Sequence, residues 1–257
     1  MLKIGDVELG DVARVAVPLS DADLQTGGKT AADMADLFEL RIDQFTKQTP
    51  DHVTQVCASA RSFGVPLIAT VRSKTEGGEA DISDPARVEL YRAMAPHVDA
   101  FDVEHFSGIR GDLVMLARTS KKPLVLSYHN FDHTPPEMHL IDIINAAKMA
   151  GADIVKLALT AKNEADLARL LDLLRSYRRK NLIVIAMGAA GMASRVMFPL
   201  FGSLITFAFL KKSNAPGQLS LFELVRELQR YSPLYAKTRA ARRPAAPAAA
   251  EGDNNSA

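Results

Sequence analysis

The sequence predicts a single α/β domain, a (β/α)8 barrel, and three observations carry that prediction. Short apolar segments rich in β-branched residues recur eight times, and amphipathic stretches with helical spacing lie between them. Strands that alternate with helices pair in parallel, and eight strand–helix units over roughly 220 residues approach the length of about 250 that such a barrel typically needs. No glycine-rich fingerprint follows either of the first two strands, as an open doubly wound sheet would require.

Each element is placed by its hydrophobic spacing and by the turn residues around it. The predicted strands are Arg14–Leu19, Phe38–Asp43, Pro66–Arg72, Ala100–Phe106, Pro123–His129, Ala152–Leu159, Asn181–Met187 and Leu204–Leu210. The clearest helices are Asp84–Ala95, Glu137–Ala150, Asn163–Arg178 and Leu219–Tyr231. Residues 1–10, with Asp6 and Gly10 as turn residues, are expected to form a hairpin that covers the bottom of the barrel.

The chain changes character near its end. Residues 1–236 form the predicted barrel domain, whereas residues 237–257 are rich in alanine, proline and arginine and lack apolar periodicity. Such a composition is typical of disorder, and we expect a solvated tail there.

Composition narrows the class of protein. The chain has 257 residues and a net charge of +1, with basic and acidic residues spread along it, so no nucleic-acid partner is expected. Cys57 is the only cysteine, which excludes an intramolecular disulfide and a cysteine-based zinc site and suits a reducing compartment. The longest uncharged run, Leu182 to Ser194, is too short to span a bilayer, and the N-terminus lacks a signal-peptide core. We expect a cytoplasmic protein without a membrane partner.

One lysine stands in the middle of a buried strand. Ile154, Lys156 and Ala158 share a face of the predicted strand 152–159, because side chains alternate along a strand. Burial disfavours the charged amine, and a neutral amine in a pocket attacks carbonyl carbons to form a Schiff base. From this strand alone, a catalytic lysine and a lysine paired with a buried carboxylate are both open.

Further polar residues share the inward face of other strands. The same alternation groups side chains on one face of each strand: Glu39, Arg41 and Asp43; Thr70 and Arg72; Asp102 and Glu104; Ser127 and His129. Residues 39–43, Arg72, His129 and Lys156 lie at or near the carboxyl ends of strands, where barrels of this kind build their active sites. Glu76 follows the third strand within reach of His129 and is expected to orient it. Arg195, in the loop after the seventh strand, suits a carboxylate or a phosphate, and Gln218 belongs to a loop expected to fold over a bound ligand.

At these positions the chain resembles a known family, the type I 3-dehydroquinate dehydratases. The resemblance spans nearly the whole chain up to the tail. It rests on segments 39–43 (Glu-Leu-Arg-Ile-Asp), 72–79 (Arg-Ser-Lys-Thr-Glu-Gly-Gly-Glu), 127–131 (Ser-Tyr-His-Asn-Phe), 152–156 (Ala-Asp-Ile-Val-Lys), Met187-Gly188 through Ser194-Arg195, and 215–218 (Ala-Pro-Gly-Gln). The resemblance implies dehydration of 3-dehydroquinate to 3-dehydroshikimate in the shikimate pathway, on a TIM barrel, with no metal and no organic cofactor.

The resemblance also implies roles for individual residues. Lys156 would form an imine with the substrate ketone, and His129 would transfer protons with Glu76 beside it. The implied substrate-binding residues are Glu39, Arg41, Arg72, Arg195, Asn214 and Gln218, with Arg195 on the substrate carboxylate. Members of the family are often dimeric, so a homodimer stays open.

The chemistry agrees with the residue types. An imine acidifies the neighbouring carbon, and imidazole is a suitable base for its proton. We expect cations such as Arg195 to help keep Lys156 neutral, and Glu76 to fix one tautomer of the His129 ring and to support its charged form.

The chain also departs from the family pattern, and other interpretations remain. Asn214 stands where the family usually has serine, and Asn130 where aspartate is common. His129 and His133 lie four apart at a strand end rather than on a helix, so no metal site is expected. The alternatives are another Schiff-base barrel enzyme, such as a class I aldolase, and a non-catalytic barrel that binds a metabolite of the same pathway.

Overall fold

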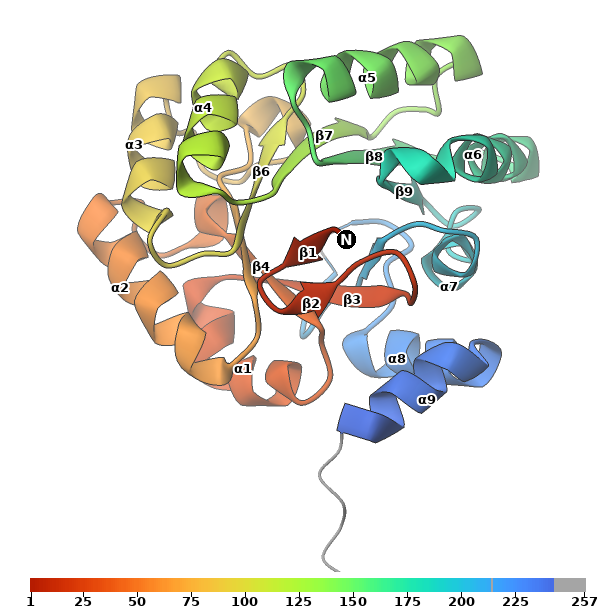
Figure 1. Cartoon of the computed structure of the whole chain (residues 1–257), viewed down its shortest axis with the longest axis horizontal. Helices are drawn as coiled ribbons and strands as arrows, with labels where there is room; N and C mark the ends of the chain where they lie inside the picture. The colour runs from red at the N-terminus through yellow and green to blue at the C-terminus, as the bar shows by residue number, and fades with distance from the viewer. Residues whose placement is uncertain (214, 243–257) are drawn as a thin grey trace, which may run out of the picture.

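The computed structural model describes residues 1–213 and 215–242, and it shows a barrel of parallel strands ringed by helices (Figure 1). The barrel strands are β3 (Arg14–Leu19), β4 (Leu37–Arg41), β5 (Leu67–Thr70), β6 (Ala100–Glu104), β7 (Leu124–Asn130), β8 (Ile154–Thr160), β9 (Leu182–Met187) and β10 (Ile205–Phe207). Neighbours pair in chain order from β3 to β9, and β10 pairs with β3. The backbone N–H of Leu204 donates to Leu182 O at 2.9 Å and so joins the last strand to β9. The predicted (β/α)8 barrel is confirmed.

The helices surround this sheet. They are α1 (Asp21–Ala32), α2 (Pro50–Ala60), α3 (Asp84–Met94), α4 (Arg110–Ser120), α5 (Glu137–Ala150), α6 (Glu164–Tyr177), α7 (Ser194–Leu200), α8 (Leu221–Tyr231) and α9 (Pro233–Arg242). Ser20 and Ser220 form capping boxes with Asp23 and Glu223, which satisfy N–H groups at the starts of α1 and α8. All four helices that the sequence predicts are present.

Several strands end earlier than predicted at the carboxyl end of the barrel. The predicted strand 38–43 leaves the sheet at Arg41 and continues as a short 3-10 helix, and strand 66–72 ends at Thr70. The last predicted strand ends at Phe207.

Side chains alternate between two cores, as the period of a strand requires. Val155, Leu157 and Leu159 of β8 pack among the helices, whereas Ile154 and Ala158 face the barrel interior with other strands' residues. Lys156 therefore points into the interior, as predicted.

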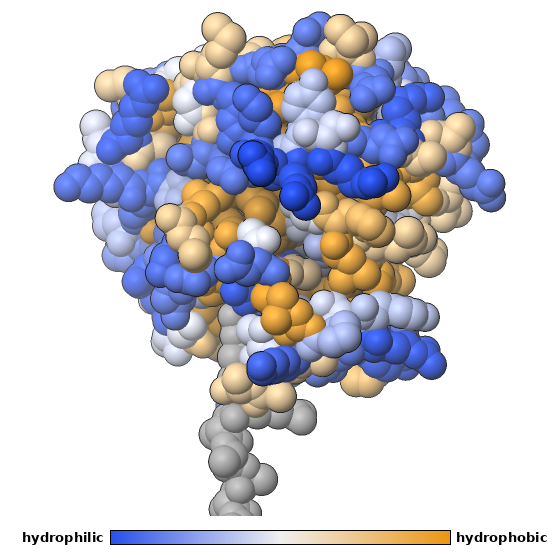
Figure 2. Space-filling model, turned by 45° about the vertical axis from the view of Figure 1, so that its right-hand side comes forward, coloured by the Kyte–Doolittle hydropathy of each residue, from blue (hydrophilic) through white to orange (hydrophobic). Residues whose placement is uncertain are grey.

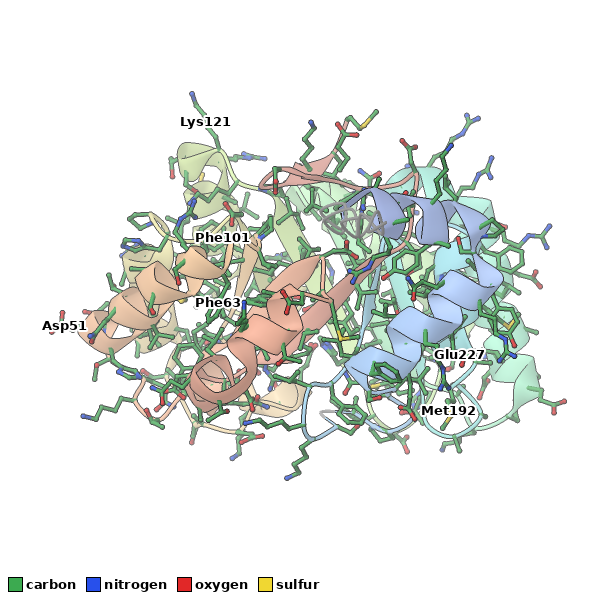
Figure 3. All side chains as sticks on the ribbon, turned by 90° about the horizontal axis from the view of Figure 1, so that it is seen from below. Asp51, Phe63, Phe101, Lys121, Met192 and Glu227 are labelled. Atoms are coloured by element: carbon green, nitrogen blue, oxygen red, sulfur yellow. The ribbon has the colours of Figure 1, made fainter. Side chains whose placement is uncertain are left out.

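A hairpin closes the amino end of the barrel. Strands β1 (Lys3–Ile4) and β2 (Val7–Glu8) pair antiparallel, and Ile4, Val7 and Leu9 pack against the interior core. Figure 1 shows the hairpin lying across the barrel, and Figure 3 shows Lys121, before β7, and Met192, after β9, at opposite ends of the molecule. The predicted hairpin is confirmed, but Gly5 and Asp6 form its turn and Gly10 lies beyond it.

Polar side chains join the strands in pairs at this same end. One such side chain stands just before each of β4, β6, β8 and β10 and accepts a backbone N–H near the start of the preceding barrel strand. Asp36 accepts from Val15 (2.7 Å), Asp99 from Leu67 (2.8 Å), Asp153 from Leu124 (2.9 Å) and Ser203 from Val184 (3.0 Å). These four contacts fix the register of the barrel where the hairpin seals it.

The start of the predicted tail is helical. Helix α9 runs to Arg242, so residues 237–242 differ from the predicted disorder, and residues 243–257 lie outside the described part of the chain. Alanine favours helix, and the Arg239 guanidinium donates to Asp33 O (3.0 Å) and Met34 O (2.5 Å) after the end of α1.

The surface over the later helices is mixed. Figure 2 shows hydrophilic side chains interrupted by apolar patches, and exposed large apolar residues on α7 and α8 include Met197, Leu200 and Phe222. No helix within residues 1–213 and 215–242 has the length and apolar character needed to cross a bilayer.

Candidate active site

A cavity opens at the carboxyl ends of the barrel strands. It holds about 550 Å³ of empty space, counting its mouth, which is within the range of small-molecule sites. Eight of the nine site residues expected from the sequence line it: Glu39, Arg41, Arg72, Glu76, His129, Lys156, Arg195 and Gln218. The ninth, Asn214, lies outside the described residues.

The Lys156 amine lies deep in this cavity between two carboxylates. Its Nζ is 3.2 Å from Asp102 Oδ2 and 3.4 Å from Glu39 Oε1, and it lies 4.3 Å from the centre of the Phe207 ring. The lysine is 4% exposed. The charged groups nearest to this amine are therefore acids, Asp102 from β6 and Glu39 from β4, which reach it across the barrel interior. The expected effect of Arg195 on the charge of Lys156 stays a prediction. The lysine is paired with carboxylates and also lines the cavity, and a catalytic role for it stays a prediction.

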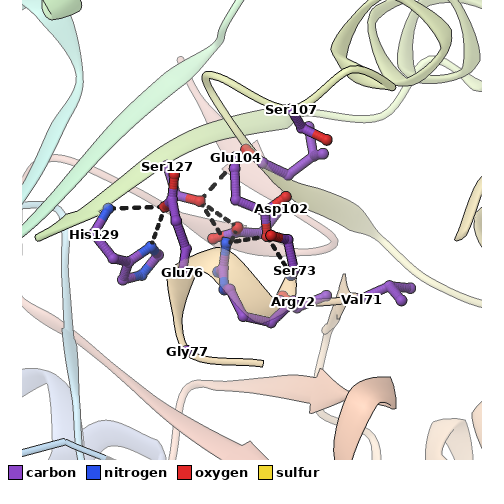
Figure 4. Close-up of polar contacts among 12 residues, drawn as sticks. Val71, Arg72, Ser73, Glu76, Gly77, Asp102, Glu104, Ser107, Ser127 and His129 are labelled. Atoms are coloured by element: carbon purple, nitrogen blue, oxygen red, sulfur yellow. Dashed lines mark hydrogen bonds and ion pairs between the residues drawn. The ribbon is translucent and has the colours of Figure 1, made fainter. Parts of the chain in front are cut away.

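Arg72 lies at the centre of the buried charges (Figure 4). Its Nη2 donates to Asp102 Oδ1 (2.7 Å), and its Nη1 donates to Glu104 Oε1 (3.0 Å) and Ser127 Oγ (2.8 Å). Burial opposes the charge of Arg72, but Asp102 and Glu104 outweigh it and raise the pKa of Arg72 well above its usual value. Conversely, Arg72 and Lys156 overcome burial and hold the pKa of Asp102 well below its usual range.

A second arginine supports this network from helix α3. Arg87 reaches Glu104 Oε2 and also donates to Val71 O at 2.9 Å. Glu104 therefore bridges Arg87 and Arg72, and it accepts the Ser73 N–H at 2.8 Å as well.

His129, on β7, forms a pair with Glu76, from the loop after β5. Glu76 Oε2 lies 2.9 Å from His129 Nδ1 and accepts the His129 backbone N–H, also at 2.9 Å (Figure 4). A proton on Nδ1 donates to Glu76 and leaves Nε2 as the basic nitrogen of the ring.

Burial governs the charge of this pair. It raises the pKa of Glu76 to about 7 and, with Arg72 and Lys156 nearby, lowers the pKa of His129 well below its usual value. The imidazole is thus a neutral base near pH 7. Glu76 shares this dry environment, and the expectation that it supports the charged ring stays a prediction.

Arg195 is a buried cation that no anion of residues 1–213 and 215–242 pairs with. It is 2% exposed, and its Nε and Nη2 have no hydrogen-bond partner among the described residues. Burial lowers the pKa of Arg195 to about 10. An anionic ligand in the cavity would supply the missing acceptors.

The two loops beside Arg195 touch backbone to backbone. Gly188 N donates to Pro216 O at 3.1 Å. Gly217 has a φ of +72°, and a Cβ there would lie 2.3 Å from Gly188 O, so both geometry and space require glycine. This contact holds the segment carrying Gln218 against the loop that leads to Arg195.

Several residues of this network carry no sequence signal that assigns them a role. The only sequence signal for Asp102, Glu104 and Ser127 is that each lies on the inward face of its strand. Arg87 lies on an ordinary amphipathic helix, and Phe207 reads as a core aromatic, so nothing local marked either.

No group of three or more His, Cys, Asp or Glu side chains within residues 1–213 and 215–242 is placed to hold a metal ion. His133 Nδ1 contacts Asp132 at 3.0 Å on an exposed part of the loop, whereas His129 points to Glu76.

Comparisons with known proteins agree with one another. The family model for type I 3-dehydroquinase matches residues 15–232. The 3-dehydroquinate dehydratase of Thermodesulfovibrio yellowstonii is 36% identical over 218 residues, which is 84% of this chain and 95% of that protein. The crystal structure of the Aquifex aeolicus 3-dehydroquinate dehydratase aligns with a TM-score of 0.77 at 35% identity, covering 86% of this chain and 100% of that one.

The Clostridium difficile type I 3-dehydroquinate dehydratase, solved with covalently modified comenic acid, aligns with a TM-score of 0.82 at 29% identity, covering 89% of this chain and 96% of that one. The family match covers the cavity, the strands that build it and the helices around them. This chain belongs to the type I 3-dehydroquinase family.

Proposed function

We propose that the chain dehydrates 3-dehydroquinate to 3-dehydroshikimate through an imine on Lys156. The observation that carries this proposal is the content of one buried cavity: an amine, a neutral imidazole and a guanidinium that lacks an anion. A keto acid with hydroxyl groups complements all three. Family membership supports the same substrate.

The covalent step uses the amine. After giving up a proton, Lys156 Nζ adds to the ketone carbon, and loss of water from the adduct leaves a C=N bond. The imine draws electrons from the adjacent carbon and makes its C–H bond acidic. Phe207, 4.3 Å from Nζ, provides an apolar wall on this side of the cavity.

The elimination uses the His129–Glu76 pair. Nε2 of His129 takes the carbon proton, the electron pair forms the new C=C bond, and the β-hydroxyl leaves as it receives a proton from the same ring. Glu76 holds Nδ1–H at 2.9 Å and so keeps Nε2 available as the base. Hydrolysis of the imine then releases the enone and restores Lys156.

The other lining residues bind the substrate. Arg195 pairs with its carboxylate, Glu39 and Arg41 contact its hydroxyls, and Arg72 holds Asp102 and Glu39 in place around the amine. Gln218 and Asn214 belong to the closing loop.

The proposal also includes a homodimer in a reducing, cytoplasmic compartment. The exposed apolar residues of α7 are compatible with a dimer interface, and the single buried thiol of Cys57 is compatible with a reducing compartment. Sedimentation of the purified chain tests the dimer.

One experiment tests the chemistry. Wild-type protein is incubated with 3-dehydroquinate, turnover is followed by the absorbance of the conjugated enone, and borohydride is added to trap the imine. We expect turnover and a mass increase on Lys156. Lys156→Ala loses both, whereas Lys162→Ala, which removes an exposed lysine beyond the same strand, keeps both. A wild-type protein that neither turns over nor is trapped contradicts the proposal, and turnover of sugar phosphates would indicate an aldolase instead.

A further inference from the structure

The loop between β5 and α3 carries two residues of the site. Residues 72–79 hold Arg72 at the start and Glu76 near the apex. The loop folds tightly, since Glu76 N and Gly78 N both donate to Ser73 O, at 3.0 and 2.9 Å. A Cβ on Gly78 would lie 2.2 Å from Arg72 O, so the backbone passes close to its own beginning.

A single carboxylate holds both ends of this loop together. Asp43 Oδ1 accepts the Arg72 N–H at 3.3 Å, and Asp43 Oδ2 accepts the Glu79 N–H at 3.1 Å. The Asp43 side chain is fully buried, and it is fixed in turn by Arg41, whose Nε and Nη2 donate to the same two oxygens at 2.9 and 2.6 Å. Arg41 Nη2 also reaches Gly77 O at 3.3 Å.

The other side of the loop meets strand β7. Glu76 contacts the backbone and the ring of His129, both at 2.9 Å. Gly77 faces the Phe131 ring, which would lie 2.8 Å from a Cβ at that position. The loop is therefore held between the end of β4 and the end of β7, and Asp43 supplies the β4 side.

Asp43 itself does not line the cavity, unlike Arg41 and Glu76. Its oxygens are occupied by four donors from Arg41, Arg72 and Glu79. Any influence of Asp43 on the reaction must therefore pass through the residues that it holds.

We infer that Asp43 is a positioning residue for the His129–Glu76 pair: it fixes loop 72–79 so that the Glu76 carboxylate meets His129 Nδ1. This inference rests on the proposed function, because it assigns Asp43 to the proton-transfer step. Asparagine at position 43 keeps the shape but turns one acceptor into a donor that opposes Arg41 and a backbone N–H. Glu76 then loses its fixed distance to the ring, and misplacement by about 1 Å in a site costs up to about 10²-fold in rate.

The test is a double-variant cycle with a matched control. Asp43→Asn, Glu76→Gln and the combined variant are compared with wild type for kcat and KM. We expect Asp43→Asn to lower kcat by roughly 10- to 100-fold in the wild-type background and to have little effect on kcat once Glu76 is glutamine. Any change in KM that passes through Arg41 persists in both backgrounds.

The control is Asp36→Asn, at the other end of β4. Asp36 is buried as well, accepts a backbone N–H from Val15 and lies 3.9 Å from Arg14. We expect it to lower stability without a change in kcat. If Asp43→Asn does not fold, Asp43→Glu keeps the charge, displaces it by one methylene and should reproduce the loss of kcat.

Equal losses of kcat in the two backgrounds would overturn the inference, since Asp43 would then act independently of Glu76. Unchanged kcat in both Asp43 variants would overturn it as well. Failure of the proposed function looks different: the wild-type protein itself would show neither turnover nor a trapped adduct.

Discussion

The two ends of the barrel use the same residue type for different purposes. At the hairpin end, Asp36, Asp99 and Asp153 each accept a backbone N–H near the start of a neighbouring strand, and apolar side chains fill the space between them. At the cavity end, Asp43 and Asp102 are bound to arginines or to Lys156. The first arrangement fixes strand register, whereas the second places charged groups around empty space. Strand β4 joins both, with Asp36 at one end and Asp43 at the other.

The two ends are therefore stabilised by different interactions. A buried ion pair gains little over a well-packed apolar contact, but removing one partner is costly. The hairpin end is therefore sealed mainly by apolar packing, and the cavity end keeps charges because the proposed chemistry needs them. Five substitutions test this contrast between the two ends.

The largest effect is expected for Arg72→Met at the cavity end. It leaves Asp102 and Glu104 buried without their shared cation, and breaking such a network costs about 3–5 kcal/mol. Arg14→Met, which removes an arginine from the hairpin end, should cost less than Arg72→Met, because Arg14 lies 3.9 Å from Asp36 and this carboxylate still accepts the Val15 N–H. Urea unfolding measures both, and equal losses would refute the distinction between the two ends.

Next comes Ile4→Ala in the hairpin. Ile4 is fully buried against the interior core, so its truncation should cost about 3 kcal/mol, in the middle of the range for such changes. Turnover at 25 °C should match wild type, because the cavity lies at the opposite end. A fall in kcat without partial unfolding would show that the two ends are coupled.

Glu76→Gln should change how stability depends on pH. Burial raises the pKa of Glu76 from 4.5 to about 7, so the folded protein holds this proton more tightly than the unfolded chain does. Wild-type stability contributed by this proton is present below pH 4.5 and is lost as pH rises through 7, up to about 3 kcal/mol at 1.36 kcal/mol per pKa unit. The glutamine variant should thus gain on wild type between pH 4 and pH 8 in urea titrations. A constant difference between them across this range would contradict the raised pKa.

The smallest effect on stability is expected for Arg195→Met, with the opposite sign. Arg195 is buried, and two of its guanidinium nitrogens have no partner in the described part of the chain, so its replacement should stabilise the ligand-free protein by about 0.5–2 kcal/mol, as changes at functional sites commonly do. The same variant should raise KM about 10- to 100-fold, because a hydrogen-bonded charge is worth about 1.5–3 kcal/mol. Thermal unfolding and steady-state kinetics measure the two effects, and a destabilised variant would indicate a structural role for this arginine.

The sequence predicts much of this architecture because its periods are strong. Alternation along β8 places Lys156 inside and Leu157 outside, and the structure agrees. The same rule brings Glu39, Arg72 and His129 to one cavity. The helical start of the predicted tail was missed, because the contacts of Arg239 with the end of α1 join residues about 205 positions apart.

Charge states were harder to predict than positions. The sequence places Glu76 near His129, but not the degree of burial that lowers the pKa of the ring and raises that of the carboxylate. Likewise, the strand pattern shows that Lys156 points inward but not that Asp102 and Glu39 are the groups nearest to its amine. Electrostatics depends on distances across the barrel, and no local pattern encodes those.

The hairpin has a consequence for how molecules enter and leave. Ile4, Val7 and Leu9 close one end of the barrel. Reactant, released water and product therefore all pass through the cavity opening at the other end. The product must therefore leave before the next reactant can enter. A fluorophore or a solid support attached at Met1 would lie at the closed end of the barrel, away from the cavity opening.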